Sequence, residues 1–158
     1  MNTSSEELKI RDFKKNDINK KYLSWLNDKK LLKFSRNKNI VYNYQKSIQY
    51  FNTFKKSNNL FFVIIFKKIK IGTATVYFKN KNKIANIGIL IGDNSFQNKG
   101  FATKIILKLI KRIKIKKELA FFEIGTSIKN LKMIRVAKKC KFKIYKKNSR
   151  YVYFKKKI

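Results

Sequence analysis

The chain has no histidine, no proline and a single cysteine in 158 residues. Without histidine it contains no Ser-His or Cys-His nucleophile pair and no histidine-bearing zinc site. The one cysteine, Cys140, forms no internal disulfide, and it falls within a helical apolar pattern. We therefore interpret Cys140 as a core thiol and expect no metal centre.

Glycine is also scarce, and the spacing of the five glycines excludes two nucleotide sites. It matches neither the dinucleotide pattern G-x-G-x-x-G nor the phosphate loop G-x-x-x-x-G-K-[ST]. The glycines are Gly72, Gly88, Gly92, Gly100 and Gly125. Nicotinamide and ATP sites of those types are excluded.

Long apolar runs are absent, since none approaches the roughly 20 residues needed to cross a bilayer. The first seven residues are polar and acidic, unlike the basic and then apolar start of a secretory signal. No Pro-, Gly- or Ser-rich stretch divides the chain, and its length suffices for one domain with a core. We expect a single domain over residues 1–158 and a cytoplasmic location.

Acidic residues are few: 8 Asp and Glu stand against 41 Lys and Arg, for a net charge of +33. Such a charge attracts polyanions. The lysines are spread along nearly the whole chain, as the codon bias of an AT-rich genome would produce, and no aromatic-interleaved basic motif is visible. We therefore expect no dedicated nucleic-acid role, and charge-driven nucleic-acid binding stays an alternative.

Hydrophobic periodicity predicts about seven strands and four helices. The expected strands span residues 8–13, 60–66, 71–78, 84–91, 120–126, 142–146 and 151–155. The expected helices span residues 17–28, with Asn16 or Asp17 as N-cap, 42–56, 101–116 and 130–139. An antiparallel meander followed by a β-α-β crossover gives a three-layer α/β domain with a mixed sheet. A ligand is expected at the carboxyl end of the fourth strand, where the crossover helix starts.

The most informative stretch is residues 87–103, an apolar strand, a polar loop and a glycine at a helix start. The helix from Phe101 has an apolar face of Ile105, Ile106, Leu109, Ile110 and Ile113. Its first-turn amides have no partner within the helix and favour an anion. Gly100 lets a phosphate approach the backbone closely, and the small Ala102 keeps a second approach open. The loop is therefore a candidate pyrophosphate site.

Residues 97–102, Gln-Asn-Lys-Gly-Phe-Ala, fit the Q/R-x-x-G-x-G/A pattern of the GNAT N-acetyltransferase superfamily. Residues 22–28, 87–103 and 130–142 also resemble segments of its branch that includes ribosomal-protein N-terminal and amino-sugar acetyltransferases. The resemblance covers nearly the whole chain. It implies a GNAT-like, mostly antiparallel twisted sheet whose strands four and five splay apart, and acetyl-CoA as co-substrate.

The resemblance also implies cofactor contacts. The backbone of Leu90, Ile91 and Gly92 would pair with pantetheine like an added strand, and an amide there would polarise the thioester oxygen. The pyrophosphate would bind the loop formed by Gln97, Asn98, Lys99, Gly100, Phe101, Ala102 and Thr103. Asn130 would meet the cofactor arm. The lysines expected near the 3′-phosphate are Lys99, Lys104 and Lys132.

The catalytic residues are less clearly marked. The strand-four glutamate that often serves as base in this branch corresponds to Asn86, which can position a water or an amine but cannot accept a full proton. Our candidate base is Glu123 in strand five. If its side chain faces inward, desolvation among apolar neighbours would raise its pKa. We expect Asp93 to accept local amides. The family tyrosine that protonates the thiolate corresponds to Ala137, and Lys141 replaces a usual glycine.

The acceptor is a primary amine, expected between strand five and residues 29–43, with Trp25, Phe34 and Arg36 as candidate contacts. A nucleotide-linked amino sugar is preferred because a basic cleft would hold its diphosphate. A protein N-terminus fits the same motifs. Asn86 and Ala137 also leave open a non-catalytic module that binds CoA. A monomer or homodimer without a membrane partner is expected.

Overall fold

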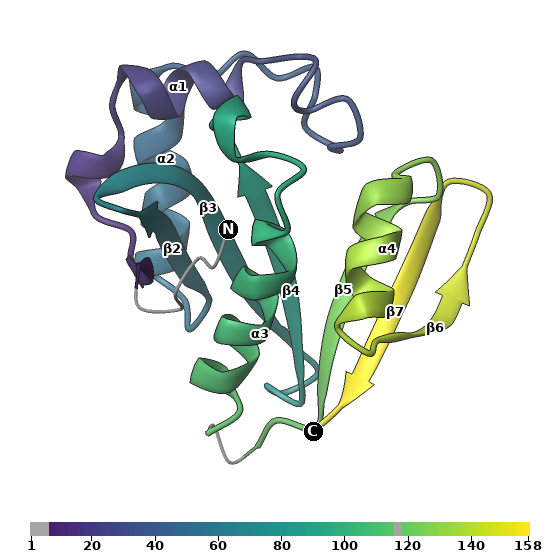
Figure 1. Ribbon diagram of the computed structural model, residues 1–158. Helices are drawn as coiled ribbons and strands as arrows, with labels where there is room; N and C mark the ends of the chain where they lie inside the picture. The colour runs from purple at the N-terminus through teal and green to yellow at the C-terminus, as the bar shows by residue number, and fades with distance from the viewer. Residues whose placement is uncertain (1–6, 116–117) are drawn as a thin grey trace. The chain divides into compact units, whose positions relative to one another are not determined.

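The computed structural model describes residues 7–115 and 118–158 (Figure 1). The elements of the N-terminal half are β1 Leu8–Asp12, the 3-10 turn η1 Lys15–Asp17, α1 Lys20–Leu26, α2 Tyr44–Lys55, β2 Leu60–Phe66 and β3 Ile69–Lys79. Those that follow are β4 Ile84–Ile91, the 3-10 turn η2 Asn94–Phe96, α3 Phe101–Ile113, β5 Phe121–Ser127, α4 Leu131–Lys139, β6 Lys143–Lys147 and β7 Tyr151–Lys157.

Within the described residues, seven strands form one mixed sheet in the order β1-β2-β3-β4-β5-β7-β6. β4 and β5 run parallel, whereas β5 pairs antiparallel with β7. The mixed sheet with four α-helices confirms the predicted fold class. The second and fourth strands agree residue for residue with the prediction.

The start of the first helix was predicted incorrectly. Asn19, rather than Asn16 or Asp17, caps α1 and accepts the amide of Tyr22 at 2.9 Å. The Asp17 side chain is unavailable as a helix cap because it accepts hydrogen bonds from Arg11 and from the amide of Lys14. The residues before Asn19 therefore form the separate turn η1.

The crossover helix is also shorter than predicted. α3 ends at Ile113, and the expected end at residue 116 lies outside the described residues. Its predicted apolar face is confirmed in four positions, Ile105, Ile106, Leu109 and Ile113, which are at most 1% exposed.

The chain divides into two compact units. Two of the boundaries fall inside strands β3 and β4, and the third lies between residues 97 and 98, in the loop before α3. The first unit comprises residues up to 75 together with 89–97. In it, β1 and β2 pair antiparallel from Leu8↔Phe66 to Asp12↔Phe62, and α2 lies against β2 (Figure 1). Its aromatic core includes Phe13 stacked on Phe61 with ring centroids 4.0 Å apart. A single domain over 1–158 stays a prediction.

The second unit comprises residues 76–88 and 98–158. β4 and β5 pair over Ile84–Asn86 and Phe121–Glu123, and β7 lies between β5 and β6. α3 and α4 contact each other. Cys140, at the end of α4, is fully buried beside the carbonyl of Thr103, which confirms it as a core thiol.

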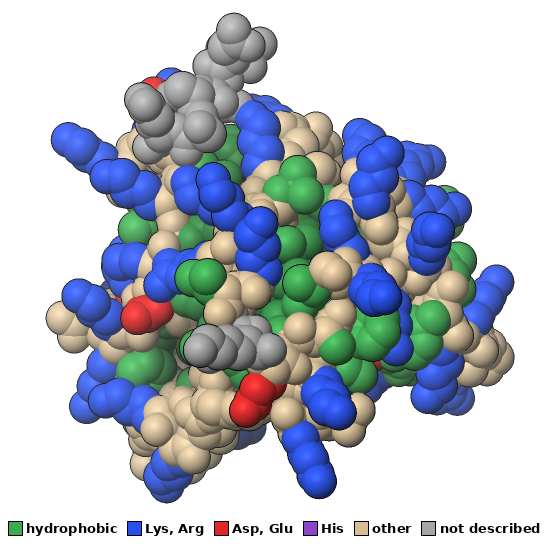
Figure 2. All heavy atoms as spheres, turned by 90° about the horizontal axis from the view of Figure 1, so that it is seen from below, with side chains coloured by type: hydrophobic (Ala, Val, Ile, Leu, Met, Phe, Trp, Pro, Cys, Tyr) green, Lys and Arg blue, Asp and Glu red, His purple; other side chains and the backbone are tan. Residues whose placement is uncertain are grey.

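Lysine and arginine side chains are scattered over the face of the molecule in Figure 2, among neutral and hydrophobic ones, and acidic side chains are few. In the part of the chain that the structure describes, no helix has both the length and the apolar character required to cross a membrane.

Candidate active site

A buried carboxylate is the centre of a polar cluster in the second unit. Glu123 on β5 is 4% exposed. Its Oε1 accepts hydrogen bonds from Lys79 Nζ at 2.8 Å and from Asn86 Nδ2 at 2.7 Å. Tyr145 donates its hydroxyl to Oε2. Three donors from β3, β4 and β6 therefore surround one carboxylate.

Strand register explains why these side chains meet. Asn86 is the parallel register partner of Glu123, so both side chains point to the same face of the sheet. In the β6–β7 pairing, Ile144 is opposite Phe154 and Lys146 is opposite Tyr153. The residue between them, Tyr145, is thus the extra residue of a bulge, a feature that re-aims a side chain.

The electrostatics correct one expectation about Glu123. Burial taken alone raises its pKa, as the sequence suggested. The hydrogen bonds from Lys79, Tyr145 and Asn86, together with the charge of Lys79, outweigh burial and hold the pKa of Glu123 below its ordinary value. Glu123 is therefore an ionised carboxylate at neutral pH, and hydrogen-bond donors of the protein take the place of water around it.

Burial and the neighbouring Glu123 carboxylate, with a further contribution from Tyr153, raise the pKa of Tyr145 to about 12. Tyr145 is therefore a protonated donor at neutral pH. Its side chain is 45% exposed, and that of Lys79 is 50% exposed. The two groups that cover Glu123 are thus themselves open to solvent, and a ligand amine could replace either of them at the carboxylate.

The loop before α3 has the geometry that the sequence predicts for an anion site. Gly100 has φ +79°, in the left-handed region, and the position that a Cβ would occupy has no described atom within 4 Å. Asn98 also has a positive φ of 58°. The first-turn amides of the 13-residue helix α3 have no carbonyl partner within the helix. This end of α3 fits a diphosphate.

The end of β4, in the first unit, holds its loop through specific hydrogen bonds. Gln97 donates from Nε2 to the carbonyl of Ile91 at 3.0 Å and to Asn94 Oδ1 at 3.1 Å. Gln97 therefore ties the loop to the strand. Asp93 accepts the amide of Ser95 at 3.0 Å, which confirms its expected capping role.

One predicted backbone contact is already in use. The Gly92 amide donates to the carbonyl of Ile71 on β3 at 2.9 Å, so it is not the amide that would polarise a thioester. Backbone groups alternate between the two edges of a strand. The amide of Ile91 therefore points to the opposite edge from that of Gly92, and Ile91 is the better candidate for that role.

Asn130 is the N-cap of α4. Its Oδ1 accepts the amide of Met133 at 3.3 Å, and its Nδ2 donates to Thr126 Oγ1 at 3.1 Å. Both ends of the side-chain amide are therefore used in tying α4 to β5. The lysines predicted near a 3′-phosphate, Lys99, Lys104 and Lys132, are exposed.

The predicted acceptor contacts lie in the first unit and differ in environment. Trp25 on α1 is 7% exposed, and a Cβ built on Gly92 would lie 2.1 Å from its ring. Phe34 is half-buried with Lys33 Nζ 4.8 Å from its ring centroid. Arg36 is exposed. Of the three, Trp25 is a packing residue at the end of β4.

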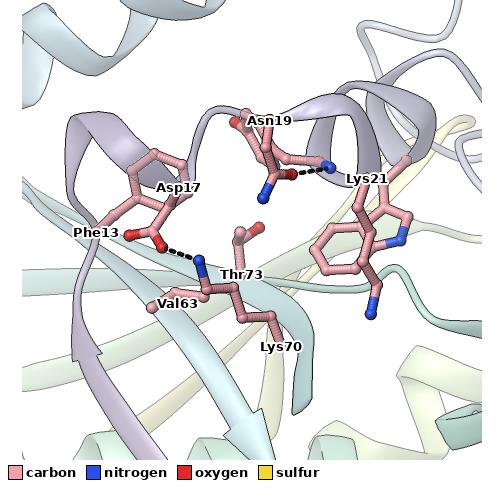
Figure 3. A pocket seen from close by; sticks show the side chains of 9 residues that line it. Phe13, Asp17, Asn19, Lys21, Val63, Lys70 and Thr73 are labelled. Carbon is pink, nitrogen blue, oxygen red and sulfur yellow. Dashed lines mark hydrogen bonds and ion pairs between the residues drawn. The ribbon is translucent and has the colours of Figure 1, made fainter. Parts of the chain in front are cut away.

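A small pocket in the first unit lies beside Trp25 (Figure 3). Asp17 holds one side of it, with Arg11 and Lys70 as ion-pair partners at 2.8 and 2.6 Å. The pocket is lined by Phe13, Asp17, Asn19, Lys21, Tyr22, Trp25, Val63, Lys70 and Thr73. The Asp17 carboxylate in this pocket is thus held by two cations and is 3% exposed.

Residues 7–115 and 118–158 contain no group of three or more His, Cys, Asp or Glu side chains arranged to hold a metal ion. Sequence reasoning identified Glu123 and Asn86 but missed Lys79 and Tyr145, which lie 44 and 22 residues from Glu123. No local pattern marks such partners. A tyrosine in a lysine-rich edge strand was the only available signal.

The family is established by sequence. The profile of the acetyltransferase (GNAT) domain matches residues 7–143, and the chain belongs to this family, as the motifs predicted. It is therefore an acetyltransferase, and acetyl-CoA is the co-substrate of the family. No curated protein sequence matches the chain significantly.

Solved structures agree with this fold. The ribosomal L7/L12 α-N-protein acetyltransferase RimL, solved with coenzyme A, is similar with a TM-score of 0.85 at 16% identity, over 99% of this chain and 96% of that one. The microcin C7 self-immunity acetyltransferase MccE, solved with acetyl-CoA and AMP, gives 0.80 at 20% identity, over 97% and 93%. Spermidine N-acetyltransferase from Vibrio cholerae, with CoA and spermine, gives 0.82 at 16% identity, over 96% of each chain.

Proposed function

We propose that this chain transfers an acetyl group from acetyl-CoA directly to a primary amine, and that the preferred acceptor is a nucleotide-linked amino sugar. The observation that carries the proposal is the buried, ionised Glu123 carboxylate beside Asn86 in a chain of the acetyltransferase family. A cytoplasmic location and a monomeric or dimeric state remain predictions.

The first-turn amides of α3 and the open space beside Gly100 would hold the pyrophosphate of the co-substrate. The Ile91 amide would polarise the thioester oxygen. Acetyl-CoA supplies an activated acetyl thioester; the transfer replaces a C–S bond with a C–N bond, releases the thiol and removes one proton from the amine.

Glu123 is the group we assign to that proton. Because Asn86 and Glu123 are register partners, the carboxylate occupies the neighbourhood in which this branch of the family places a strand-four glutamate. Its lowered pKa suits binding of a cationic amine better than removal of a proton from a free ammonium, whose pKa is about 10.4. We therefore assign Glu123 to hold the ammonium, which loses one proton to solvent before attack because a protonated nitrogen has no lone pair. Glu123 then accepts the second proton as the C–N bond forms, and that proton passes on to the released thiolate.

Release of the thiol has no assigned acid. The family tyrosine position is Ala137, which is fully buried in α4. A thiolate with a pKa of about 8.5 is a tolerable leaving group without one. The absence of that tyrosine therefore bears on rate more than on whether transfer occurs.

The acceptor class is tested with a panel. The purified protein is given acetyl-CoA and, in turn, a nucleotide-linked amino sugar, a peptide with a free N-terminus, spermidine and an aminoglycoside, and thiol release is followed. Turnover of the amino sugar supports the proposal. Turnover of the peptide alone would instead favour a protein N-terminal acetyltransferase, the activity named for RimL, which shares this fold.

The catalytic assignment is tested with Glu123→Gln, with the exposed Glu118→Gln as control. We expect Glu123→Gln to lower kcat by about 10²-fold while calorimetric affinity for acetyl-CoA stays within twofold. Unchanged kcat across pH would remove Glu123 from the mechanism. Acetyl-CoA binding by the unaltered protein without turnover of any amine would identify a non-catalytic CoA-binding module.

A further inference from the structure

One face of the β5–β7–β6 part of the sheet, in the second unit, interleaves tyrosines and lysines. Along β7, Tyr151, Tyr153 and Lys155 point to one face because side chains alternate along a strand. Lys156 points to the other face, where its ammonium donates to the carbonyl of Cys140 at the end of α4 at 2.8 Å. The tyrosines are therefore on the face of β7 opposite to Lys156, away from α4.

Strand β6 adds two residues to this side. Lys146 Nζ lies 5.5 Å from the ring centroid of Tyr153, and Lys155 Nζ lies 4.9 Å from that of Tyr145. We call the set Tyr145, Lys146, Tyr151, Tyr153 and Lys155 the tyrosine–lysine face. The sequence does not reveal it, since the bulge and the alternation of β7 are needed to bring these side chains to one side.

The ring of Tyr153 rests on the backbone of β5. A Cβ built on Gly125 would lie 2.9 Å from two carbons of that ring, so only glycine at this position admits the ring. One side of the Tyr153 ring is therefore packed against β5, and its position on this face of the sheet is fixed.

The tyrosine rings and lysine ammonium groups of this face are complementary to a ligand that carries both a flat base and phosphates. A cation above an exposed aromatic ring contributes about 0.5–1 kcal/mol, whereas a nucleobase stacked on an aromatic side chain contributes about 1–3 kcal/mol. A base can therefore replace the Lys146 ammonium above Tyr153. The displaced ammonium then stays within reach of the phosphates attached to the base.

We propose that the tyrosine–lysine face binds the nucleoside diphosphate part of the acceptor, with the base on Tyr153 and the phosphates held by Lys146 and Lys155. This inference rests on the proposed function, whose amine-binding carboxylate is on the same face. Glu123 is the register partner of Lys155, and Gly125 is that of Tyr153. The carboxylate of Glu123 is thus two residues, ~7 Å, along β5 from Gly125, on which the Tyr153 ring packs.

The position of Glu123 also separates a short nucleotide from a polynucleotide. A nucleic-acid strand that continued along β5 from Tyr153 would bring further phosphates to an ionised carboxylate. A nucleotide-linked amine instead presents a cation there. The charges on this face therefore favour the nucleoside diphosphate of a small acceptor.

The test is calorimetric titration of the full chain with UDP, with coenzyme A at saturation so that the end of α3 does not take up the diphosphate. We expect Tyr153→Leu and Lys146→Gln each to weaken UDP binding by about tenfold. The matched controls, Tyr44→Leu on α2, where the side chain is 50% exposed, and Lys139→Gln on α4, should change it by less than twofold. Circular dichroism checks that each variant is folded.

Two comparison ligands separate the alternatives. Uridine should bind at least tenfold more weakly than UDP if lysines hold the phosphates. Equal affinity of the variants and the unaltered chain for UDP would overturn the assignment, and so would tighter binding of oligouridylate than of UDP. The titration measures binding without acetyl transfer. Loss of UDP binding in Tyr153→Leu would therefore support nucleotide binding by the tyrosine–lysine face even if no amino sugar were acetylated. Failure to acetylate an amino sugar would contradict only the proposed function.

Discussion

The Asn86 side chain on β4 donates to Glu123 Oε1 on β5 at 2.7 Å, across a parallel pair in which the two residues are register partners. A carboxylate moved from β5 to β4 would therefore stay in the same neighbourhood. We expect the double variant Asn86→Glu with Glu123→Gln to recover at least tenfold in kcat over Glu123→Gln alone. Steady-state thiol release measures this, and a double variant as slow as the single one would contradict it.

Lys79 supplies the first of the hydrogen bonds that lower the pKa of Glu123. Lys79→Met should therefore raise that pKa. If the ionised form is the active one, the acidic limb of the kcat profile moves toward neutral pH, with activity lost at a higher pH than in the unaltered chain. Lys139→Met on α4 is the control of equal charge change. Identical acidic limbs in both variants would show that Lys79 does not tune the active carboxylate.

Gly100 adopts φ +79° beside open space. Gly100→Ala should lower the free energy of unfolding by about 1 kcal/mol through backbone strain alone. It should also weaken acetyl-CoA binding, because the new methyl group stands where the phosphate approaches. Gly100→Asn, a residue that tolerates the left-handed region, should be more stable than Gly100→Ala but equally poor at binding. Urea unfolding and calorimetry measure the two effects separately, and intact binding in both variants would rule out the phosphate site.

Gly92 leaves room for the Trp25 ring, since a Cβ there would lie 2.1 Å from Cδ2. Gly92→Ala should therefore destabilise the chain by about 1–3 kcal/mol through overpacking. The smaller side chain of Trp25→Leu should offset part of this loss in the double variant. A double-mutant cycle of unfolding free energies measures the coupling, and additive effects would show that the two residues do not press on each other.

Asp17 is 3% exposed. Burial opposes its ionisation, but hydrogen bonds from Arg11, Lys70 and the Lys14 amide hold its pKa well below the ordinary range. A lowered folded-state pKa contributes stability that is present above the unfolded pKa of about 3.9 and is lost as pH falls further. The stability difference between the unaltered chain and Asp17→Asn should thus be greatest at neutral pH and shrink below pH ~4. Urea unfolding at pH 7 and pH 3 tests this, with the exposed Asp12→Asn as control; an equal difference at both pH values would contradict the assignment.

Local patterns located most elements because they record periodicity within one helix or strand. The strand at Leu60–Phe66 follows from an apolar run. The helix expected from residue 42 begins at Tyr44 instead, because the side chain of Asn43 caps it. The prediction failed at Asp17 because its partners Arg11 and Lys70 belong to two other segments, and an aspartate used in an ion pair is unavailable as a cap.

The candidate site divides in the same way. The geometry of the loop at Gly100 could be predicted because a glycine turn at a helix start is built from consecutive residues. Its role in binding an anion stays a prediction. The ionisation of Glu123 could not, since burial and pairing oppose each other and only the positions of Lys79 and Tyr145 decide between them.

The amino-acid sequence by itself determined the family, the order of strands and helices and the backbone form of the loop at Gly100, because each depends on side chains close together along the chain. Tertiary structure decided which groups share a carboxylate and which side chains share a sheet face. Those depend on strand register and on one bulge in β6, where a shift of a single residue would turn Tyr145 away from Glu123.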